Sequence, residues 1–339
     1  MVIIRPVAES DLDDLAQLAE GASFGLTSLP KDRELLAERI AQSCRDFVRS
    51  PRKPRGELYL FVMEDLETRR VVGTSCIVSK VGGFEPFYAY RVQTCVHEST
   101  HLGIRKEIPI LHLVTEHSGP CEIGGLYLST SYRKHGNGRL LSLFRFLFMA
   151  EYPERFEPTV IAEMRGVVDE RGHSAFWEAL GRHFFEMDFP RADYLSLSDK
   201  RFIADLMPTC PIYIPLLPKE AQEVVGKVHR NTEPALKMLL DEGFRFSGMV
   251  DIFEAGPIIM ADLHDIRTVR DNRQTAVARI ATELSEAPLG LVAVFGESFR
   301  TCTGRAAVDS DGRAIVEKAT ADALGVHEGD RIRFGALRA

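Results

Sequence analysis

Residues 133–138, Arg-Lys-His-Gly-Asn-Gly, combine basic side chains with two glycines in the spacing R-x-x-G-x-G. Glycines placed in this way let the backbone turn tightly and approach a ligand closely. The segment follows a predicted strand and opens a long apolar helix, so free N–H groups at the helix start would face an anion. The sequence therefore predicts a pyrophosphate site, although a glycine turn before a core helix is the alternative. The residues expected to bind are Arg133, Lys134, Gly136, Asn137 and Gly138.

Gly124 and Gly125 lie inside the strand that precedes this segment. Glycines weaken a strand, and the usual reason for them is a β-bulge or a close approach of the backbone to a ligand. A bulge would part the strand from its neighbour and aim a backbone N–H near Gly125 or Leu126 into the gap. Such an N–H can hold a thioester oxygen as it gains charge. A bulge without a function is the alternative.

Residues 95–121 hold a group of histidines and cysteines that could suggest a metal site. His97 and His101 could share a metal on a helix. The segment is partly strand-like, however, and in a strand residues i and i+4 lie about 13 Å apart. We therefore expect no metal.

The elements that must position these groups alternate between strand and helix patterns. The predicted strands cover residues 3–5, 58–64, 71–79, 88–96, 108–114, 121–128, 159–165, 211–217 and 245–253. The predicted helices cover residues 32–48, 137–150, 174–180, 218–225, 234–242 and 318–324. From about residue 287 the chain becomes rich in strands, with a hairpin turn at Asp311-Gly312.

An internal similarity bears on the domain organisation. Residues 175–184 and 235–244 share Ala, Leu and Phe at matching offsets, each with a glycine between a predicted helix and a predicted strand. A true duplication and chance both explain this similarity. We predict three parts: a ligand-binding module in residues 1–195, a second, degenerate module in 196–270, and a strand-rich segment in 271–339.

Composition excludes several classes of protein. The chain has 339 residues, 45% of them apolar, which suffices for a large core. The formal net charge is −7, which argues against general binding of nucleic acid. The six cysteines are scattered, and no apolar run approaches the length of a membrane span or a signal peptide. We expect a soluble, cytoplasmic protein.

The glycine segment after a bulged strand resembles the acyl-CoA signature of the GNAT N-acyltransferase superfamily. Longer stretches are similar to the arginine N-succinyltransferases, including the α chain of the arginine/ornithine N-succinyltransferase; they are residues 85–100, 160–194, 211–235 and 244–257. The resemblance covers nearly the whole chain and is least specific after Asp271. It implies an α/β (α+β) fold: an acyltransferase-like mixed sheet flanked by helices, in two related modules, with a strand-rich C-terminal segment.

The resemblance also implies a reaction. Succinyl-CoA and L-arginine would give N2-succinylarginine and CoA, the first step of arginine catabolism by the succinyl route. His229, in the segment G-x-V-H, matches the family's proton donor, and Leu126 or Gly125 would contact succinyl-CoA. Since residues 196–270 lack R-x-x-G-x-G, that module would cover the acceptor site and supply His229.

The chemistry supports these roles independently. The α-amine must lose a proton and the departing thiolate must gain one, and a histidine with a pKa near ~6.5 can serve either step. A guanidinium substrate requires carboxylates, and the succinyl carboxylate requires a cation. The carboxylate candidates are Glu163, Asp169 and Glu170, and the cation candidates are Arg91 and Arg165.

Two alternatives stay open. The same chemistry could act on ornithine or another basic amino acid. The chain could also be a CoA-binding α subunit that is active only with a related β chain; a homo-oligomer is the other possible assembly.

Overall fold

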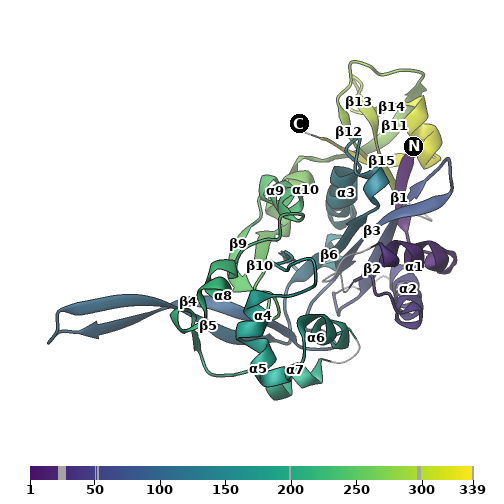
Figure 1. Ribbon diagram of the computed structural model, residues 1–339. Helices are drawn as coiled ribbons and strands as arrows, with labels where there is room; N and C mark the ends of the chain where they lie inside the picture. The colour runs from purple at the N-terminus through teal and green to yellow at the C-terminus, as the bar shows by residue number, and fades with distance from the viewer. Residues whose placement is uncertain (22–27, 50, 52, 198–199, 296–298, 338–339) are drawn as a thin grey trace.

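The computed structural model describes residues 1–21, 28–49, 51, 53–197, 200–295 and 299–337. These residues form one large mixed sheet with helices on both faces, followed by a smaller strand-rich domain at the C-terminal end (Figure 1). The predicted mixed α/β sheet flanked by helices and the strand-rich C-terminal segment are confirmed.

The large sheet runs in the order β1-β2-β3-β6-β7-β10-β9-β4-β5-β8. Neighbouring strands are antiparallel except β6 and β7, which are parallel. The strands are β1 (Val2–Pro6), β2 (Leu58–Asp65), β3 (Arg70–Val78), β4 (Phe87–Ser99), β5 (Ile104–Glu116), β6 (Cys121–Leu128), β7 (Thr159–Glu163), β8 (Ile212–Tyr213), β9 (Arg245–Val250) and β10 (Pro257–Asp262).

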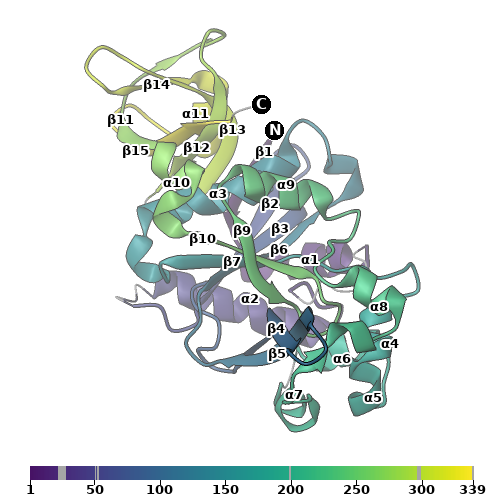
Figure 2. The ribbon, with the colours of Figure 1, turned by 90° about the vertical axis from the view of Figure 1, so that its left-hand side faces the viewer.

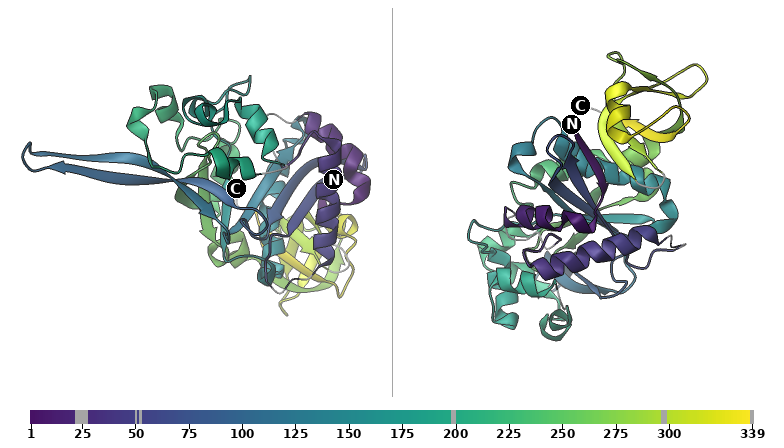
Figure 3. Two further views of the ribbon diagram at one scale, coloured as in Figure 1. Left: turned by 90° about the horizontal axis from the view of Figure 1, so that it is seen from below. Right: turned by 90° about the vertical axis from the view of Figure 1, so that its right-hand side faces the viewer.

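Helices cover the two faces of this sheet separately (Figures 2 and 3). Helices α1 (Leu12–Glu20) and α2 (Arg33–Val48) pack on one face. Helices α3 (Asn137–Glu151), α9 (Glu233–Asp241) and α10 (Arg267–Asp271) pack on the other. The alternation of side chains along β2 explains this: Leu58, Leu60 and Val62 contact the α2 side, whereas the residues between them contact the α3 side.

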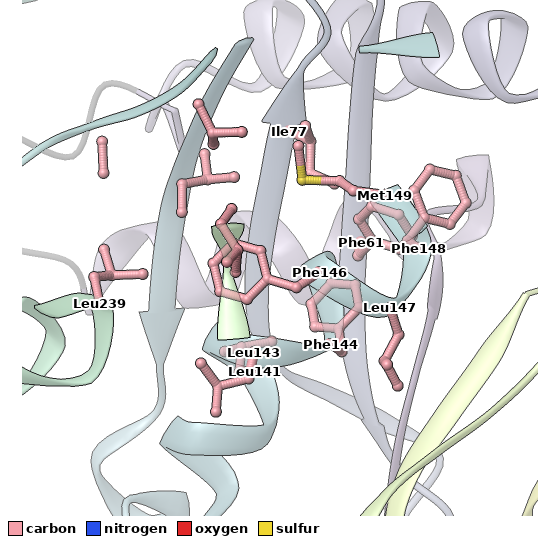
Figure 4. Packing of buried hydrophobic residues seen from close by; sticks show 14 of the residues in the cluster. Phe61, Ile77, Leu141, Leu143, Phe144, Phe146, Leu147, Phe148, Met149 and Leu239 are labelled. Carbon is pink, nitrogen blue, oxygen red and sulfur yellow. The ribbon is translucent and has the colours of Figure 1, made fainter. Parts of the chain in front are cut away.

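Helix α3 is the centre of the main core (Figure 4). Every residue from Leu140 to Met149 is buried, so the helix is surrounded by protein on all sides. The Phe144 ring lies 4.8 Å from that of Phe61 on β2, and Phe148 lies 5.1 Å from the same ring. The position of α3 relative to the sheet is therefore fixed by large, rigid side chains.

The C-terminal strands close into a small barrel. They are β11 (Arg273–Ala281), β12 (Leu289–Val294), β13 (Arg300–Val308), β14 (Ala314–Glu317) and β15 (Arg331–Ala336), with helix α11 (Lys318–Leu324) against them. The barrel joins the large sheet where Ile4 of β1 pairs with Thr301 of β13.

A group of short helices packs against the base of β4 and β5 around Trp177. They are α4 (Ala175–Ala179), α5 (Gly181–Phe185), α6 (Phe189–Leu195), α7 (Arg201–Leu206) and α8 (Lys219–Val224). The predicted strand after Gly181 is wrong, because residues 181–185 are helical and a side chain at Gly181 would collide with the Trp177 ring. Most of the predicted strand 211–217 is wrong too, since a 3-10 turn containing Pro215 follows Tyr213.

The described residues within 196–270 form no sheet of their own. Strand β10 pairs with β7, and β9 pairs with β10, so both extend the sheet that begins in residues 1–195. The strand pairing thus does not support two related modules, and the predicted boundary at residue 195 does not coincide with a break in the sheet. Only α9 followed by Phe244 and β9 has the predicted helix-glycine-strand order.

Strands β4 and β5 form a long arm that leaves the body of the molecule (Figures 1 and 3). At its base β4 pairs with β9 through Tyr90 and Arg91, and β5 pairs with β8 through Ile110 and Leu111. Beyond these residues the two strands pair only with each other as far as Ser99 and Ile104. The predicted strands 88–96 and 108–114 are confirmed, but both are longer.

Candidate active site

A cleft of about 1620 Å³ opens on the large sheet where β6 and β7 meet. Its walls come from β6, the loop before α3, the end of β7, the turn after β9, and helices α2, α6 and α9. Segments far apart in the sequence therefore line one space.

The predicted bulge in β6 is present. Thr74 on β3 pairs with Tyr127 and Cys76 pairs with Gly124, so β6 has one extra residue between them. Gly125 has a φ of +62°, and a Cβ there would lie 2.9 Å from the sulfur of Cys76. Glycine is required at this position both by the backbone conformation and by the space.

Beyond the bulge β6 and β7 separate. They pair only at Cys121 with Val160 and at Glu122 with Ile161. The strand edges after these pairs face the cleft rather than each other. This is the gap that the two glycines in β6 predict.

The loop before α3 is open toward the cleft. Gly136 is the N-cap of α3 with a φ of +78°, and a Cβ at Gly136 or Gly138 would meet no atom within 4 Å. Arg133 Nε donates to the carbonyl of Leu128 at 2.9 Å, and Asn137 Nδ2 donates to that of Tyr132 at 3.1 Å. These contacts fix the loop and leave its glycines uncovered. All seven predicted cofactor-binding residues line the cleft: Gly125, Leu126, Arg133, Lys134, Gly136, Asn137 and Gly138.

His229 lies beside the cleft and is not among the residues that line it, whereas its neighbours Arg165 and Asn231 are. The main-chain N–H of His229 donates to the carbonyl of Arg165 at 2.9 Å, just after β7 ends. Its Nδ1 accepts the N–H of Asn231 at 3.1 Å. Burial, followed by the positive charges of Arg165 and Arg230, lowers the pKa of His229 below 6.5, so the neutral imidazole prevails at neutral pH.

Four carboxylates face the cleft from three segments, and we call them the acidic pocket: Glu122, Glu163, Asp251 and Glu254. Burial raises the pKa of all four groups. For Glu163 the negative charges of Glu122, Asp251 and Glu254 raise the pKa further. Burial and the charge of Asp251 raise the pKa of Glu254 to about 8. Glu163 is nonetheless exposed to water from the cleft.

A buried cation, Arg145 of α3, also lines the cleft. Its Nη1 donates to the carbonyl of Gly124 at 3.3 Å, and its Nε donates to that of Ser142 at 2.8 Å. Burial lowers the pKa of Arg145 to about 10, which leaves the guanidinium charged at neutral pH. The guanidinium thus lies beside the bulged part of β6.

Three predicted substrate-binding residues lie outside the cleft. Arg91 is on β4, where it pairs with Met249. Asp169 accepts the N–H groups of Arg171 and His173 within its own loop. Glu170 is 94% exposed and lies 3.8 Å from Arg230. Only Glu163 and Arg165 of the five candidates line the cleft.

Sequence reasoning missed most of the acidic pocket and Arg145. Arg145 had one local signal, a single charge inside the apolar stripe of α3. Glu122, Asp251 and Glu254 had none, because residues about 130 positions apart are brought together only by the pairing of β6, β7, β10 and β9.

Neither a membrane span nor a metal site is found in the described ranges. No helix there is long and apolar enough to cross a bilayer. No group of three or more His, Cys, Asp or Glu side chains there could hold a metal ion.

Comparison with known proteins identifies close relatives. A family model described as the arginine N-succinyltransferase beta subunit matches residues 2–268, and one for that subunit's C-terminal domain matches residues 273–335. The arginine N-succinyltransferases of Escherichia coli O139:H28 and Shigella flexneri are each 43% identical over 340 residues, covering 99% of this chain and 98% of each relative. The solved structure of arginine/ornithine succinyltransferase subunit AI from Pseudomonas aeruginosa matches with a TM-score of 0.90 and 34% identity, covering 100% of this chain and 99% of that one.

Proposed function

The chain belongs to the arginine N-succinyltransferase family, and we propose that it binds succinyl-CoA and L-arginine in the cleft between β6 and β7. It is an arginine N-succinyltransferase, an acyltransferase of arginine catabolism. The observation that carries the proposal is the continuity of three features in one cleft: the bulge of β6, the gap beside β7 and the open glycine loop before α3.

The pyrophosphate of succinyl-CoA would bind at residues 133–138. The first N–H groups of α3 have no partner within the helix, and the helix dipole favours an anion there. Arg133 and Lys134 add positive charge, and Gly136 leaves room for close approach. The extended arm of CoA would then follow β6 toward the bulge.

The thioester would lie at the bulge, with its oxygen near the backbone N–H of Gly125 or Leu126. The α-amine of arginine attacks the thioester carbon, and negative charge collects on that oxygen. A C–N bond forms, the C–S bond breaks, and CoA leaves as a thiolate. No covalent intermediate with the protein is needed, because the thioester is already activated; the protein supplies orientation and charge stabilisation.

His229 would carry the proton between the two substrates. The neutral imidazole, favoured by the lowered pKa, accepts the proton that the amine loses, and the resulting imidazolium donates it to the thiolate. The anchoring of His229 to Arg165, next to the end of β7, supports this role.

The charged ends of the substrates require partners of opposite charge. Glu163 and Arg165 remain the best supported of the sequence candidates, because they line the cleft. Arg145 is a further candidate for the succinyl carboxylate, since it is a buried cation beside the bulge. Arg91, Asp169 and Glu170 have no such support.

The direct test is thiol release from succinyl-CoA by the purified chain. We expect release with arginine and none without an amine. Release with ornithine but not with arginine would favour ornithine as the acceptor. This comparison matters because the name of the Pseudomonas aeruginosa protein includes both arginine and ornithine. Activity that appears only after a second, related chain is added would favour the subunit alternative. The cytoplasmic location, the homo-oligomer and the absence of a metal remain predictions.

A further inference from the structure

We infer that the acidic pocket, formed by Glu122, Glu163, Asp251 and Glu254, is the subsite that holds the guanidinium of the acceptor amino acid. This inference rests on the proposed function, since it assumes that an amine acceptor enters the same cleft. It assigns the acceptor side chain to a specific set of carboxylates, most of which the sequence did not indicate.

Strand register places three of these carboxylates on one face of the sheet. Glu122 pairs with Ile161, and Glu163 is two residues further along the same strand, so the side chains share a face. Glu163 pairs with Ile258 and Ile258 with Met249, and Asp251 is two residues beyond Met249. This is the α2 face of the sheet, opposite to α3.

The described protein satisfies only some of the carboxylate oxygens in this pocket. Asp251 Oδ1 accepts the N–H groups of Phe253 at 2.7 Å and Glu254 at 2.8 Å. Glu254 is only 7% exposed; its Oε1 accepts the N–H of Gly166 at 2.7 Å, but its Oε2 is buried without any hydrogen bond. Among the described contacts, the carboxylates of Glu122 and Glu163 make no hydrogen bond or ion pair. A buried carboxylate oxygen without a partner is costly unless a ligand supplies the donor.

The cations around the pocket do not fully offset burial and the repulsion between its carboxylates. The described cations that act on these carboxylates are Lys200, Arg39 and Arg165. Their attraction is smaller than the combined effect of burial and mutual repulsion, because the pKa values of all four carboxylates remain raised. Another cation placed among the four carboxylates would offset their mutual repulsion and stabilise their charged forms.

A guanidinium suits this pocket in shape and reach. It is planar and offers five donors, which several carboxylate oxygens can share. The bulge at Gly125 lies three positions along β6 from Glu122, a distance of roughly 10 Å in an extended strand. An acceptor with its α-amine at the thioester would therefore extend a long side chain toward Glu122 and Glu163.

The first experiment substitutes the pocket without changing its size. Glu254→Gln and Glu163→Gln should each raise the KM for arginine by about 10- to 100-fold, the effect of losing one hydrogen bond to a charged group. The KM for succinyl-CoA should stay within twofold. Glu170→Gln, the same change at an exposed carboxylate outside the cleft, is the matched control and should alter neither value.

The second experiment varies the acceptor. Citrulline has nearly the shape of arginine but carries a neutral urea group. Wild-type protein should prefer arginine strongly, and Glu163→Gln should reduce that preference by at least tenfold. A residue with a purely structural role would lower activity toward both acceptors equally.

The folding of each variant is checked by thermal unfolding. Because Glu163 is repelled by three other carboxylates, Glu163→Gln should not lower the melting temperature. Arginine binding is measured separately by calorimetry, without turnover. Unchanged arginine binding in both folded pocket variants would overturn the subsite, whereas a wild-type protein that binds arginine but transfers no succinyl group would overturn the proposed function instead.

Discussion

The imidazole of His229 has two contacts with the backbone. Its Nδ1 accepts the N–H of Asn231 at 3.1 Å, and the ring hydrogen-bonds to the backbone of Val168. The main-chain N–H of His229 is bound separately to the carbonyl of Arg165. In the neutral ring the proton is then on Nε2, and the Asn231 N–H donor at Nδ1 disfavours further protonation there, so Nδ1 must part from Asn231 when it accepts a proton. The orientation and the lowered pKa therefore both favour a histidine that is neutral before the reaction begins.

The pH dependence of turnover follows from this state. Since the pKa of His229 lies below 6.5, the neutral form prevails at neutral pH and is lost as the pH falls through that lowered value. We predict that kcat declines on the acid side below pH 6.5. His229→Gln should remove this decline and lower kcat by about 10²- to 10⁴-fold.

A matched control is His101→Gln, a change of an exposed histidine at the tip of the arm. It should leave the kinetic profile of the wild type unchanged. An acid-side decline that persists in His229→Gln would mean that another group accepts the proton.

At the level of elements, the role of the loop before α3 in CoA binding can be tested by substituting two glycines that have nearly the same φ. Gly136 and Gly312 have φ values of +78° and +77°, and a Cβ at either position would meet no atom within 4 Å. Valine at each position should cost a similar amount of stability, about 1–2 kcal/mol for a residue forced into this conformation.

Only Gly136→Val should abolish CoA binding, because its side chain would occupy the space of the pyrophosphate. Gly312→Val lies in a hairpin turn of the C-terminal barrel and should bind CoA normally. Calorimetry with CoA and denaturant unfolding of both variants measure the two effects. Equal CoA affinity in the two variants would exclude the loop as the pyrophosphate site.

Elements were predictable from the sequence where the signal is local. The bulge at Gly125, the glycine loop and the apolar stripe of α3 each lie within a few residues, and each is present. Gly181 was misjudged because its packing against Trp177 is invisible in a helix-glycine-aromatic pattern. The acidic pocket depends on the register of four strands, which no single segment specifies.

At the scale of the whole molecule, the C-terminal barrel is built into the main core. Leu291 and Phe299 belong to the cluster around α3, and the Phe299 ring lies 5.3 Å from that of Phe148. Glu151 at the end of α3 forms ion pairs with Arg331 at 2.7 Å and Arg333 at 2.8 Å. The barrel therefore stabilises the same helix whose other end faces the cleft.

The chain should consequently unfold as one unit. We predict that Phe299→Ala lowers the free energy of unfolding by about 3–5 kcal/mol, the usual cost of removing a buried aromatic ring. Phe84→Ala, at a side chain that is 78% exposed, should cost far less. Calorimetry should show a single transition shifted to lower temperature for Phe299→Ala; an independent melting step for the barrel would contradict this coupling.

The separation of β6 and β7 gives the co-substrate a second role. Two strand edges that border a gap can accept an extended chain as an added strand, and the pantetheine arm of CoA carries amide groups along its length. Succinyl-CoA would then act as a temporary strand that joins the two halves of the sheet. Hydrogen–deuterium exchange at residues 123–126 should slow when it binds, and the empty protein would be the more loosely connected form.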